Sequence, residues 1–301
     1  MLALPLFFEC ERFISSLLLS ISEWCKTWNL NLNKDKCAVI RFSSSAKLIP
    51  NSSYILLNSQ VKFAQTHCDL GIMVDERLTW SKHYNYISQK AYHSLHLLFR
   101  TIDSTASVSL KKHLYLELVR SQFVYCSQLW RPRLIKDIKS IERIQRRATK
   151  FILHDYTSEY KSRLISLHIL PLMYWLELQD LLFLIKCLKE PSDNFNPLSF
   201  ISFVNSNTRS ATANKLKVNF NRTCHSRHFY FNRIVRLWNS LPVIDLSLSY
   251  ATLKSTLRQL FWKHFITHFD SNNPCTFHID CPCFNCVNSS HFVQPISKTP
   301  D

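Results

Sequence analysis

The spacing of hydrophobic positions changes along the chain and predicts two kinds of structure. In residues 13–28 apolar side chains recur every three or four positions, which predicts an amphipathic helix. Short apolar runs separated by polar turns follow, and they predict strands at 38–42, 54–57, 61–63 and 68–74. The chain's one glycine, Gly71, falls inside the last run, where it predicts a bulge or a close backbone approach.

From residue 80 onward the period of the apolar positions is that of a helix. The pattern predicts helices at 80–100, 107–130, 135–154, 172–190 and 251–269. Residues 192–210 are rich in Asn, Ser and Pro and predict a linker, and a basic aromatic stretch, 215–241, follows it. The fold class is therefore predicted to be α+β and mostly α, with a small antiparallel sheet followed by helices. We expect four regions, at 1–79, 80–191, 192–270 and 271–301.

The charge of the chain points to a polyanionic partner. Lys and Arg number 37 against 21 Asp and Glu, a formal net charge of +16. Each cation that neutralises a phosphate releases condensed counterions, so such a surplus favours nucleic acid. The longest apolar windows are too short to span a bilayer, and we expect no membrane segment. A chain with one glycine has no Gly-rich nucleotide loop.

The cysteines cluster only near the end of the chain. Eleven are present, and no secretory signal pattern opens the sequence, so we expect reduced thiols in an intracellular setting, nuclear or cytoplasmic. Four cysteines near the C-terminus form a candidate zinc site: Cys275, Cys281, Cys283 and Cys286. The spacing is tight for a closed finger, and a thiol-rich tail without a metal is the favoured interpretation.

Short motifs follow one another in a definite order. The first are Trp24-Cys25-x-x-Trp28-x-Leu30-x-Leu32-Asn33-x-x-Lys36-Cys37, Leu70-Gly71-x-x-x-Asp75, Leu78-x-Trp80-x-x-His83 and Lys90-Ala91. The later ones are Tyr125-Cys126-Ser127-x-x-Trp130-x-Pro132, Ile141-Glu142-x-x-Gln145-x-x-Ala148, Tyr160-x-x-Arg163-Leu164, Leu170-Pro171-Leu172, Thr208-Arg209-Ser210 and Trp238-Asn239-x-Leu241-Pro242. Each motif is weak alone, whereas the ordered series is specific.

This series resembles the reverse transcriptases of non-LTR (LINE-type) retrotransposons, in particular the jockey and chicken-repeat branches. The resemblance implies the last part of a polymerase palm at 1–79, a helical thumb at 80–191 and a helical C-terminal region. It also implies that the family's Tyr/Phe-Ala-Asp-Asp turn, which holds the catalytic metals, should precede Trp24. No two aspartates are adjacent in the sequence. We therefore expect a truncated, non-catalytic remnant that binds RNA or DNA and holds no Mg²⁺ by itself.

Cations supply the candidate nucleic-acid contacts. By the resemblance Lys36 lies near the phosphates of an incoming nucleotide, although a solvated lysine at a turn is the favoured interpretation here. Four cations at spacing i, i+3, i+4 and i+7 share one helix face: Arg143, Arg146, Arg147 and Lys150. Phosphate contact and an ordinary solvated face, with Glu142–Arg146 as a surface pair, are both open for them. Further candidates are Lys82, Lys90, Arg227 and Arg233.

Two other functions stay open. The chain could be a helical protein-interaction module, or the translation of a pseudogene without selected function. The strands expected in 1–79 leave an unpaired sheet edge, which predicts self-association through that edge.

Overall fold

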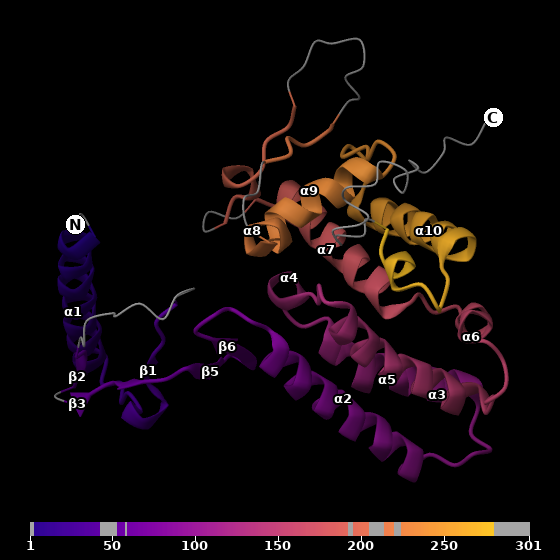
Figure 1. Ribbon diagram of the computed structural model, residues 1–301, viewed down its shortest axis with the longest axis horizontal. Coiled ribbons are helices and arrows are strands. Elements are labelled where there is room, and N and C mark those ends of the chain that lie inside the picture. The colour runs from indigo at the N-terminus through magenta and orange to yellow at the C-terminus, as the bar shows by residue number, and fades with distance from the viewer. Residues whose placement is uncertain are drawn as a thin grey trace. The chain divides into compact units, whose positions relative to one another are not determined.

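The structure is a computed structural model that describes residues 3–42, 53–57, 59–191, 195–204, 214–219 and 224–279 (Figure 1). The chain divides into two compact units, Met1–His83 and Tyr84–Asp301. The first holds one long helix and all the named strands, and the second is helical. The prediction of an α+β fold that is mostly α is confirmed, whereas the finer division at residues 79, 191 and 270 stays a prediction.

The first unit begins with α1 (Ala3–Thr27), which starts earlier than the predicted residue 13. A 3-10 turn, η1 (Lys34–Lys36), follows. The described residues after it form six short strands: β1 (Ala38–Val39), β2 (Ile55–Leu56), β3 (Ser59–Gln60), β4 (Lys62–Phe63), β5 (Thr66–Asp69) and β6 (Ile72–Asp75). They form three separate two-stranded ladders rather than the single sheet that was expected. The β2–β3 and β5–β6 pairs are antiparallel, and β1 pairs with β4 in parallel.

The expected single strand over 68–74 is wrong, because Gly71 lies in a turn. Asp69 pairs with Ile72, so Leu70 and Gly71 are the two central residues of a hairpin. Their φ angles are 45° and 83°. A type I′ hairpin turn needs positive φ at both positions, which glycine adopts without steric cost. The bulge that was predicted at Gly71 is therefore replaced by a reversal of the chain.

Two polar residues organise the link from β6 into α2 (Ser81–Thr101). Asp75 Oδ1 accepts the backbone N–H groups of Arg77 (3.1 Å) and Thr79 (2.7 Å). Buried His83 accepts the Met73 N–H on Nδ1 at 3.2 Å, and burial lowers its pKa to about 4. A neutral imidazole is needed to accept that hydrogen bond. Both residues thus have structural roles.

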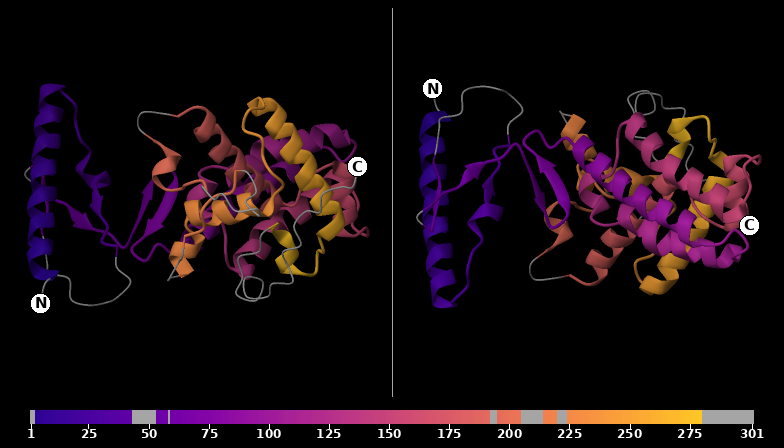
Figure 2. Two further views of the ribbon diagram at one scale, coloured as in Figure 1. Left: turned by 90° about the horizontal axis from the view of Figure 1, so that it is seen from above. Right: turned by 90° about the horizontal axis from the view of Figure 1, so that it is seen from below.

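The second unit is built from helices, seen from two further sides in Figure 2. After α2 these are α3 (Val108–Leu114), η2 (Tyr115–Val119), η3 (Arg120–Phe123), α4 (Ser127–Trp130), α5 (Ile135–Leu153), α6 (Tyr160–Leu167), α7 (Leu172–Lys189), η4 (Pro197–Ser199), α8 (Cys224–His228), α9 (Tyr230–Ser240), α10 (Tyr250–His268) and η5 (Pro274–Phe277). The predicted helices at 80–100, 135–154, 172–190 and 251–269 are confirmed within a residue or two at either end. The short helices α6, α8 and α9 were not predicted.

The predicted continuous helix at 107–130 is wrong. It consists of α3, a π-helical turn at η2, a 3-10 turn at η3 and the short α4. Cys126 adopts φ 50°, a left-handed conformation that a helix cannot continue through. The Trp130 indole N–H then donates to the Tyr125 backbone oxygen at 2.9 Å, which stabilises the reversal.

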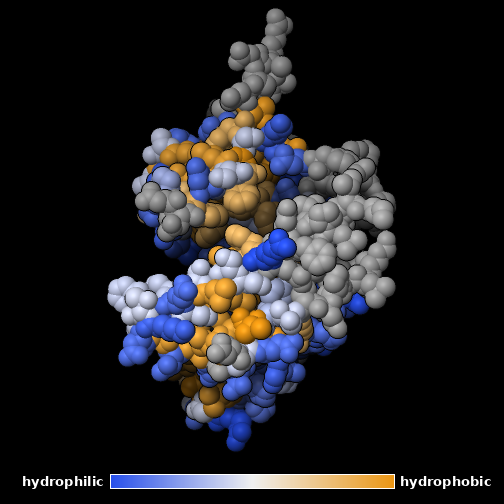
Figure 3. Space-filling view, turned by 90° about the vertical axis from the view of Figure 1, so that its left-hand side faces the viewer, coloured by the Kyte–Doolittle hydropathy of each residue, from blue (hydrophilic) through white to orange (hydrophobic). Residues whose placement is uncertain are grey.

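The core of this unit surrounds α7, which packs against α5, α9 and α10 (Figure 1). Leu176, Leu181 and Ile185 on α7 are fully buried. On the other side of α5, the Phe99 ring of α2 lies 4.6 Å from the Phe151 ring, centroid to centroid. Apolar side chains also reach the surface of the protein, as the orange areas on the face in Figure 3 show.

Among the described residues, no single helix is long and apolar enough to cross a membrane. The pair α6 and α7, bent by 48°, passes the same test of length and composition when the two are taken together. Most of α7 is buried inside the helical unit, as is typical of a core helix.

Candidate nucleic-acid interface

The helix α5 carries all of its cations on one face. Its six Lys and Arg residues lie within an arc of roughly 100°, at 3.6 residues per turn: Lys136, Lys139, Arg143, Arg146, Arg147 and Lys150. We call this set the α5 basic stripe. The last four were predicted from the sequence, and Lys136 and Lys139 continue the same spacing, from which they could have been found.

The carboxylates of α5 point away from this stripe. Asp137 and Glu142 are 9% and 1% exposed, so both lie in the interior. Glu142 accepts a short hydrogen bond from the Tyr160 hydroxyl and another from the Leu172 N–H, at 3.0 Å to Oε2. The alternative in which Glu142 and Arg146 form a surface pair is therefore wrong, because Glu142 is buried. Burial raises the pKa of Glu142, against the opposing effect of these hydrogen bonds and of Arg146.

A groove of about 470 Å³ runs beside the stripe. Its lining is Arg143, Arg146, Arg147, Lys150, Tyr156, Thr157, Ser158, Glu159, Tyr160, Arg163 and Ser271. The opposite wall is the loop before α6, which Asp155 holds by accepting the N–H groups of Thr157 (3.0 Å) and Ser158 (2.9 Å). Hydrogen bonds from Ser158 and Thr157 lower the pKa of Asp155. Five of these lining side chains are cations and one is a carboxylate.

Neighbouring groups hold two of the guanidinium groups in place. Arg146 Nη2 donates to the Ser271 backbone oxygen at 2.8 Å, and its guanidinium carbon lies 4.6 Å from the centre of the Tyr160 ring. Arg147 Nη1 donates to the Tyr92 hydroxyl at 2.6 Å. Neither arginine forms an ion pair with a described carboxylate, so their charges are not neutralised within that part of the chain. Such a groove suits an extended anion.

The remaining predicted cations lie at varied places. Lys36 is exposed in η1, Lys90 is exposed on α2, and exposed Lys82 donates to the Thr66 hydroxyl at 3.2 Å. Arg227 is half-buried on α8. None of these four lines the groove.

The structure does not place Arg233 on a surface. Its guanidinium is 4% exposed and donates to Asp180 Oδ2 from Nε at 3.2 Å and from Nη2 at 3.1 Å. A third hydrogen bond, from Nη2 to the Gln128 backbone oxygen, measures 2.7 Å. Burial lowers the pKa of Arg233, against the raising effect of Asp180. The Arg233 guanidinium therefore forms its contacts inside the core and is not a candidate for contact with nucleic acid.

The zinc prediction falls mostly outside the described residues. Cys281, Cys283 and Cys286 lie in 280–301, which the structure does not describe, while Cys275 is half-buried in η5. Within the described ranges no group of three or more His, Cys, Asp or Glu could hold a metal. Nearby, Glu177 Oε1 contacts His278 Nδ1 at 2.9 Å and Oε2 accepts the Ile279 N–H at 2.9 Å. These two contacts attach the start of the tail to α7.

Many motif residues that suggested a family belong to a buried hydrogen-bond network. Gln145, which is fully buried, accepts from the Tyr115 hydroxyl at 2.8 Å and donates to the Leu170 backbone oxygen at 3.0 Å. Buried Arg163 donates from Nε to the Thr149 hydroxyl at 3.3 Å. Such satisfied polar groups specify how α5, α6 and α7 pack together. These contacts hold α5, and with it the stripe, in place.

Three curated proteins of Drosophila melanogaster are similar in sequence to this chain. The probable RNA-directed DNA polymerase from transposon X-element is 29% identical over 135 residues, 44% of this chain and 14% of the relative. The probable RNA-directed DNA polymerase from transposon BS is 26% identical over 152 residues, which are 48% of this chain and 16% of the relative. The RNA-directed DNA polymerase from mobile element jockey is 32% identical over 71 residues, which are 23% of this chain and 7% of the relative. The chain is related to the reverse transcriptases of LINE-type retrotransposons.

The relationship confirms the family resemblance, including its jockey branch. No protein-family model and no solved structure matches the chain. The matched regions span less than a fifth of each relative's length, so the polymerase activity in those names describes far longer proteins.

Proposed function

We propose that this relative of LINE-type reverse transcriptases binds the phosphate backbone of RNA or DNA along the α5 basic stripe. The observation that carries the proposal is the stripe itself, six cations within a narrow arc on a helix whose carboxylates are both buried. A solvated face that served only solubility would normally mix both signs of charge.

The dimensions of the stripe suit a nucleic-acid strand. Lys136 and Lys150 are 14 positions apart along α5, which corresponds to roughly 21 Å at 1.5 Å per residue. One strand of a duplex presents a phosphate about every 3.4 Å along the helix axis, so the stripe can follow about six of them. Contacts of this kind position the nucleic acid without reading its sequence.

Salt dependence tests this interface. The triple variant R143Q/R147Q/K150Q removes three cations that line the groove, while their neighbours in the buried network remain. We expect the slope of log K against log salt for an RNA–DNA hybrid to become shallower by about 2–3, because each lost phosphate contact contributes about 0.7–0.9. Fluorescence anisotropy of a labelled hybrid across a salt series measures that slope.

A matched variant separates the groove from total charge. K215Q/K217Q/K254Q removes three cations of the same unit that lie outside the groove. We expect its slope to stay close to that of the wild type. Equal losses in the two variants would show that net charge, rather than α5, determines binding, and the interface would be refuted.

We also propose that the chain by itself does not extend a primer. Two-metal phosphoryl transfer needs convergent carboxylates, and the sequence contains no adjacent aspartates. Incubating the purified chain with Mg²⁺, a primer–template and dNTPs tests this, and an extended primer would refute it.

A further inference from the structure

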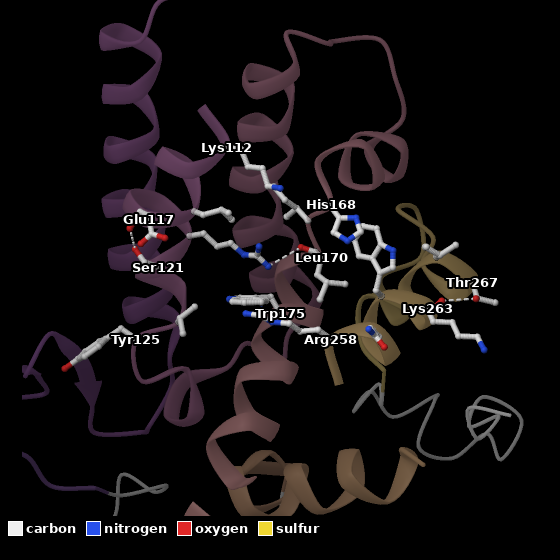
Figure 4. Close-up of a pocket in the computed structure, with 17 residues that line it drawn as sticks. Lys112, Glu117, Ser121, Tyr125, His168, Leu170, Trp175, Arg258, Lys263 and Thr267 are labelled. Atoms are coloured by element: carbon white, nitrogen blue, oxygen red, sulfur yellow. Dashed lines mark hydrogen bonds between the residues drawn. The ribbon is translucent and has the colours of Figure 1, made fainter. Parts of the chain in front are cut away.

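A second cavity lies in the helical unit, apart from the groove beside α5. It measures about 1160 Å³, somewhat above the common range of about 300–1,000 Å³ for ligand pockets. Figure 4 shows Glu117, Ser121 and Tyr125 on one side, Lys263 and Thr267 of α10 on the other, and Leu170 and Trp175 between them. The space is thus an open cleft between η2–η3 and α10.

Aromatic rings line this cleft together with cations. Trp175 on α7 has the Arg120 guanidinium carbon 4.3 Å and the Arg258 guanidinium carbon 5.8 Å from its ring centre. Trp262 on α10 lies against His168, with 4.1 Å between ring centroids. All five residues line the cavity, and both indole rings are only partly buried. The part of each indole ring that its neighbours leave exposed to the cavity is a surface on which a flat ligand can stack.

The charges of the cleft favour an anion. The charged lining residues, apart from His168, are four cations and one carboxylate: Lys112, Arg120, Arg258, Lys263 and Glu117. No ion pair between described residues involves any of them. The ligand chemistry that fits is therefore an aromatic ring system with a negative charge attached.

Arg120 adds a buried polar group that lacks a partner. It is 5% exposed, and its Nη2 reaches the Leu170 backbone oxygen only at 3.4 Å. Its Nε is buried and has no hydrogen-bond partner among the described residues. A buried donor left without an acceptor destabilises the folded chain. An acceptor brought by a ligand would offset part of that destabilisation.

The wall that carries Arg120 has an unusual backbone. It begins with the π-helical turn η2, whose Leu116 and Glu117 line the cavity, and it continues as a 3-10 turn. Such π-helical turns are rare and occur frequently at functional sites. The small α6, eight residues or roughly 12 Å long, joins the two sites, since Tyr160 and Arg163 line the groove and His168 lines the cleft.

We propose that this cleft takes unpaired nucleotides of the same nucleic acid, with bases stacked on its indole rings and phosphates beside its cations. Stacking on aromatic side chains next to basic groups is the usual way in which single strands bind without sequence preference. The proposal rests on the proposed function, since the α5 stripe supplies the first contact with the nucleic acid.

The experiment compares three nucleic acids that separate the two sites. They are a blunt RNA–DNA hybrid, the same hybrid with a short uridine overhang, and the same overhang made of abasic sugars. The blunt hybrid reports the α5 stripe alone. We expect the uridine overhang to bind about 5- to 150-fold tighter than the abasic one, the range for stacking one base.

Two variants assign that gain to the cleft. Trp262→Leu keeps an apolar side chain but removes an aromatic face, and it should abolish the difference between the overhangs while the blunt hybrid binds as before. If Trp262→Leu does not fold, Arg258→Gln at an exposed position should weaken both overhang hybrids relative to the blunt hybrid, because both overhangs keep their phosphates, and an unchanged ratio would overturn the cleft. The controls are Trp28→Leu, an exposed tryptophan outside the cleft, and Lys254→Gln, one turn before Arg258 on α10.

The outcomes distinguish the two proposals. Equal binding of the uridine and abasic overhangs to the wild type would overturn the cleft and favour a protein segment as its occupant. The cleft is likewise overturned if folded Trp262→Leu keeps the full difference. If the wild-type chain binds none of the three nucleic acids, the α5 interface is refuted instead.

Discussion

The buried charges around Asp180 allow a sharp test of what holds the helical unit together. Asp180 Oδ2 accepts from Arg131 Nη1 at 3.0 Å and from Arg233 at 3.1 and 3.2 Å. A second carboxylate, Glu177, lies 3.8 Å from Arg131 Nη2. The four side chains are 0–5% exposed. Two cations and two anions thus share one water-poor space.

The variant Asp180→Asn removes one negative charge at almost constant volume. Arg131 then keeps Glu177 as its carboxylate partner, while Arg233 loses the only acidic partner among its described ion pairs. Breaking a buried pair in this way costs about 3–5 kcal/mol. Since whole domains are stable by about 5–15 kcal/mol, the loss should be a large part of the total.

The measurement is urea denaturation of the full chain, followed by tryptophan fluorescence and circular dichroism. Arg233→Met should cost less than Asp180→Asn, because Asp180 keeps Arg131 as its partner. The double variant should be more stable than the sum of the single losses predicts, by about 0.5–3 kcal/mol of coupling. Glu190→Gln, a carboxylate-to-amide change at an exposed position, is the control and should stay within about 0.5 kcal/mol of the wild type. A loss below about 1 kcal/mol for Asp180→Asn, or strictly additive losses, would refute the reasoning.

Three further predictions concern other parts of the chain, and a fourth concerns its assembly. Burial lowers the pKa of His264 to about 4, so between that pH and about 6.5 the unfolded chain binds a proton that the folded chain does not. The free energy of unfolding should therefore fall as the pH is lowered from about 6.5 toward 4, by at most about 1.4 kcal/mol per pH unit. The urea midpoint of His264→Gln should change less than that of the wild type over the same range. In the β5–β6 turn, Leu70→Asn should stabilise the hairpin and Gly71→Ala should destabilise it by about 1 kcal/mol. Hydrogen exchange of the β5 and β6 amides measures both effects, and unchanged exchange in both variants would contradict the turn assignment. If the tail binds zinc, mass spectrometry should detect one bound metal ion in the wild type and none in the Cys283→Ser/Cys286→Ser variant. Wild-type protein that stays metal-free after zinc is added would exclude the zinc site. The predicted self-association through strand edges should appear in sedimentation velocity as a concentration-dependent dimer, whereas a monomer at every concentration would contradict it.

Local periodicity was sufficient to predict four of the long helices. The apolar period of 3.6 predicts α2, α5, α7 and α10 within a residue or two at their ends, because one face of each must be buried. The cationic spacing on α5 was also visible, since a helix places i, i+3, i+4 and i+7 together wherever it lies. The ordered motifs along the same chain identified the retrotransposon relationship.

Only the tertiary structure decided which polar residues are interior. Glu142 and Gln145 look like surface positions in the sequence, yet their partners Tyr160, Leu170 and Leu172 come from later segments that fold over α5. A carboxylate can be buried where hydrogen bonds offset its lost hydration, and no local pattern records those partners.

The same reason explains the errors at Arg233 and Gly71 and the cleft that was missed. Arg233 finds Asp180 53 positions away, and the cleft joins residues of 112–125, 168–175 and 258–267. Leu70 looks like a core residue but is 83% exposed, because the pairing of β5 with β6 needs a turn there. Sequence patterns therefore determined the four long helices of the helical unit and which of their faces carry charge, while chain packing decided which charges stay in water.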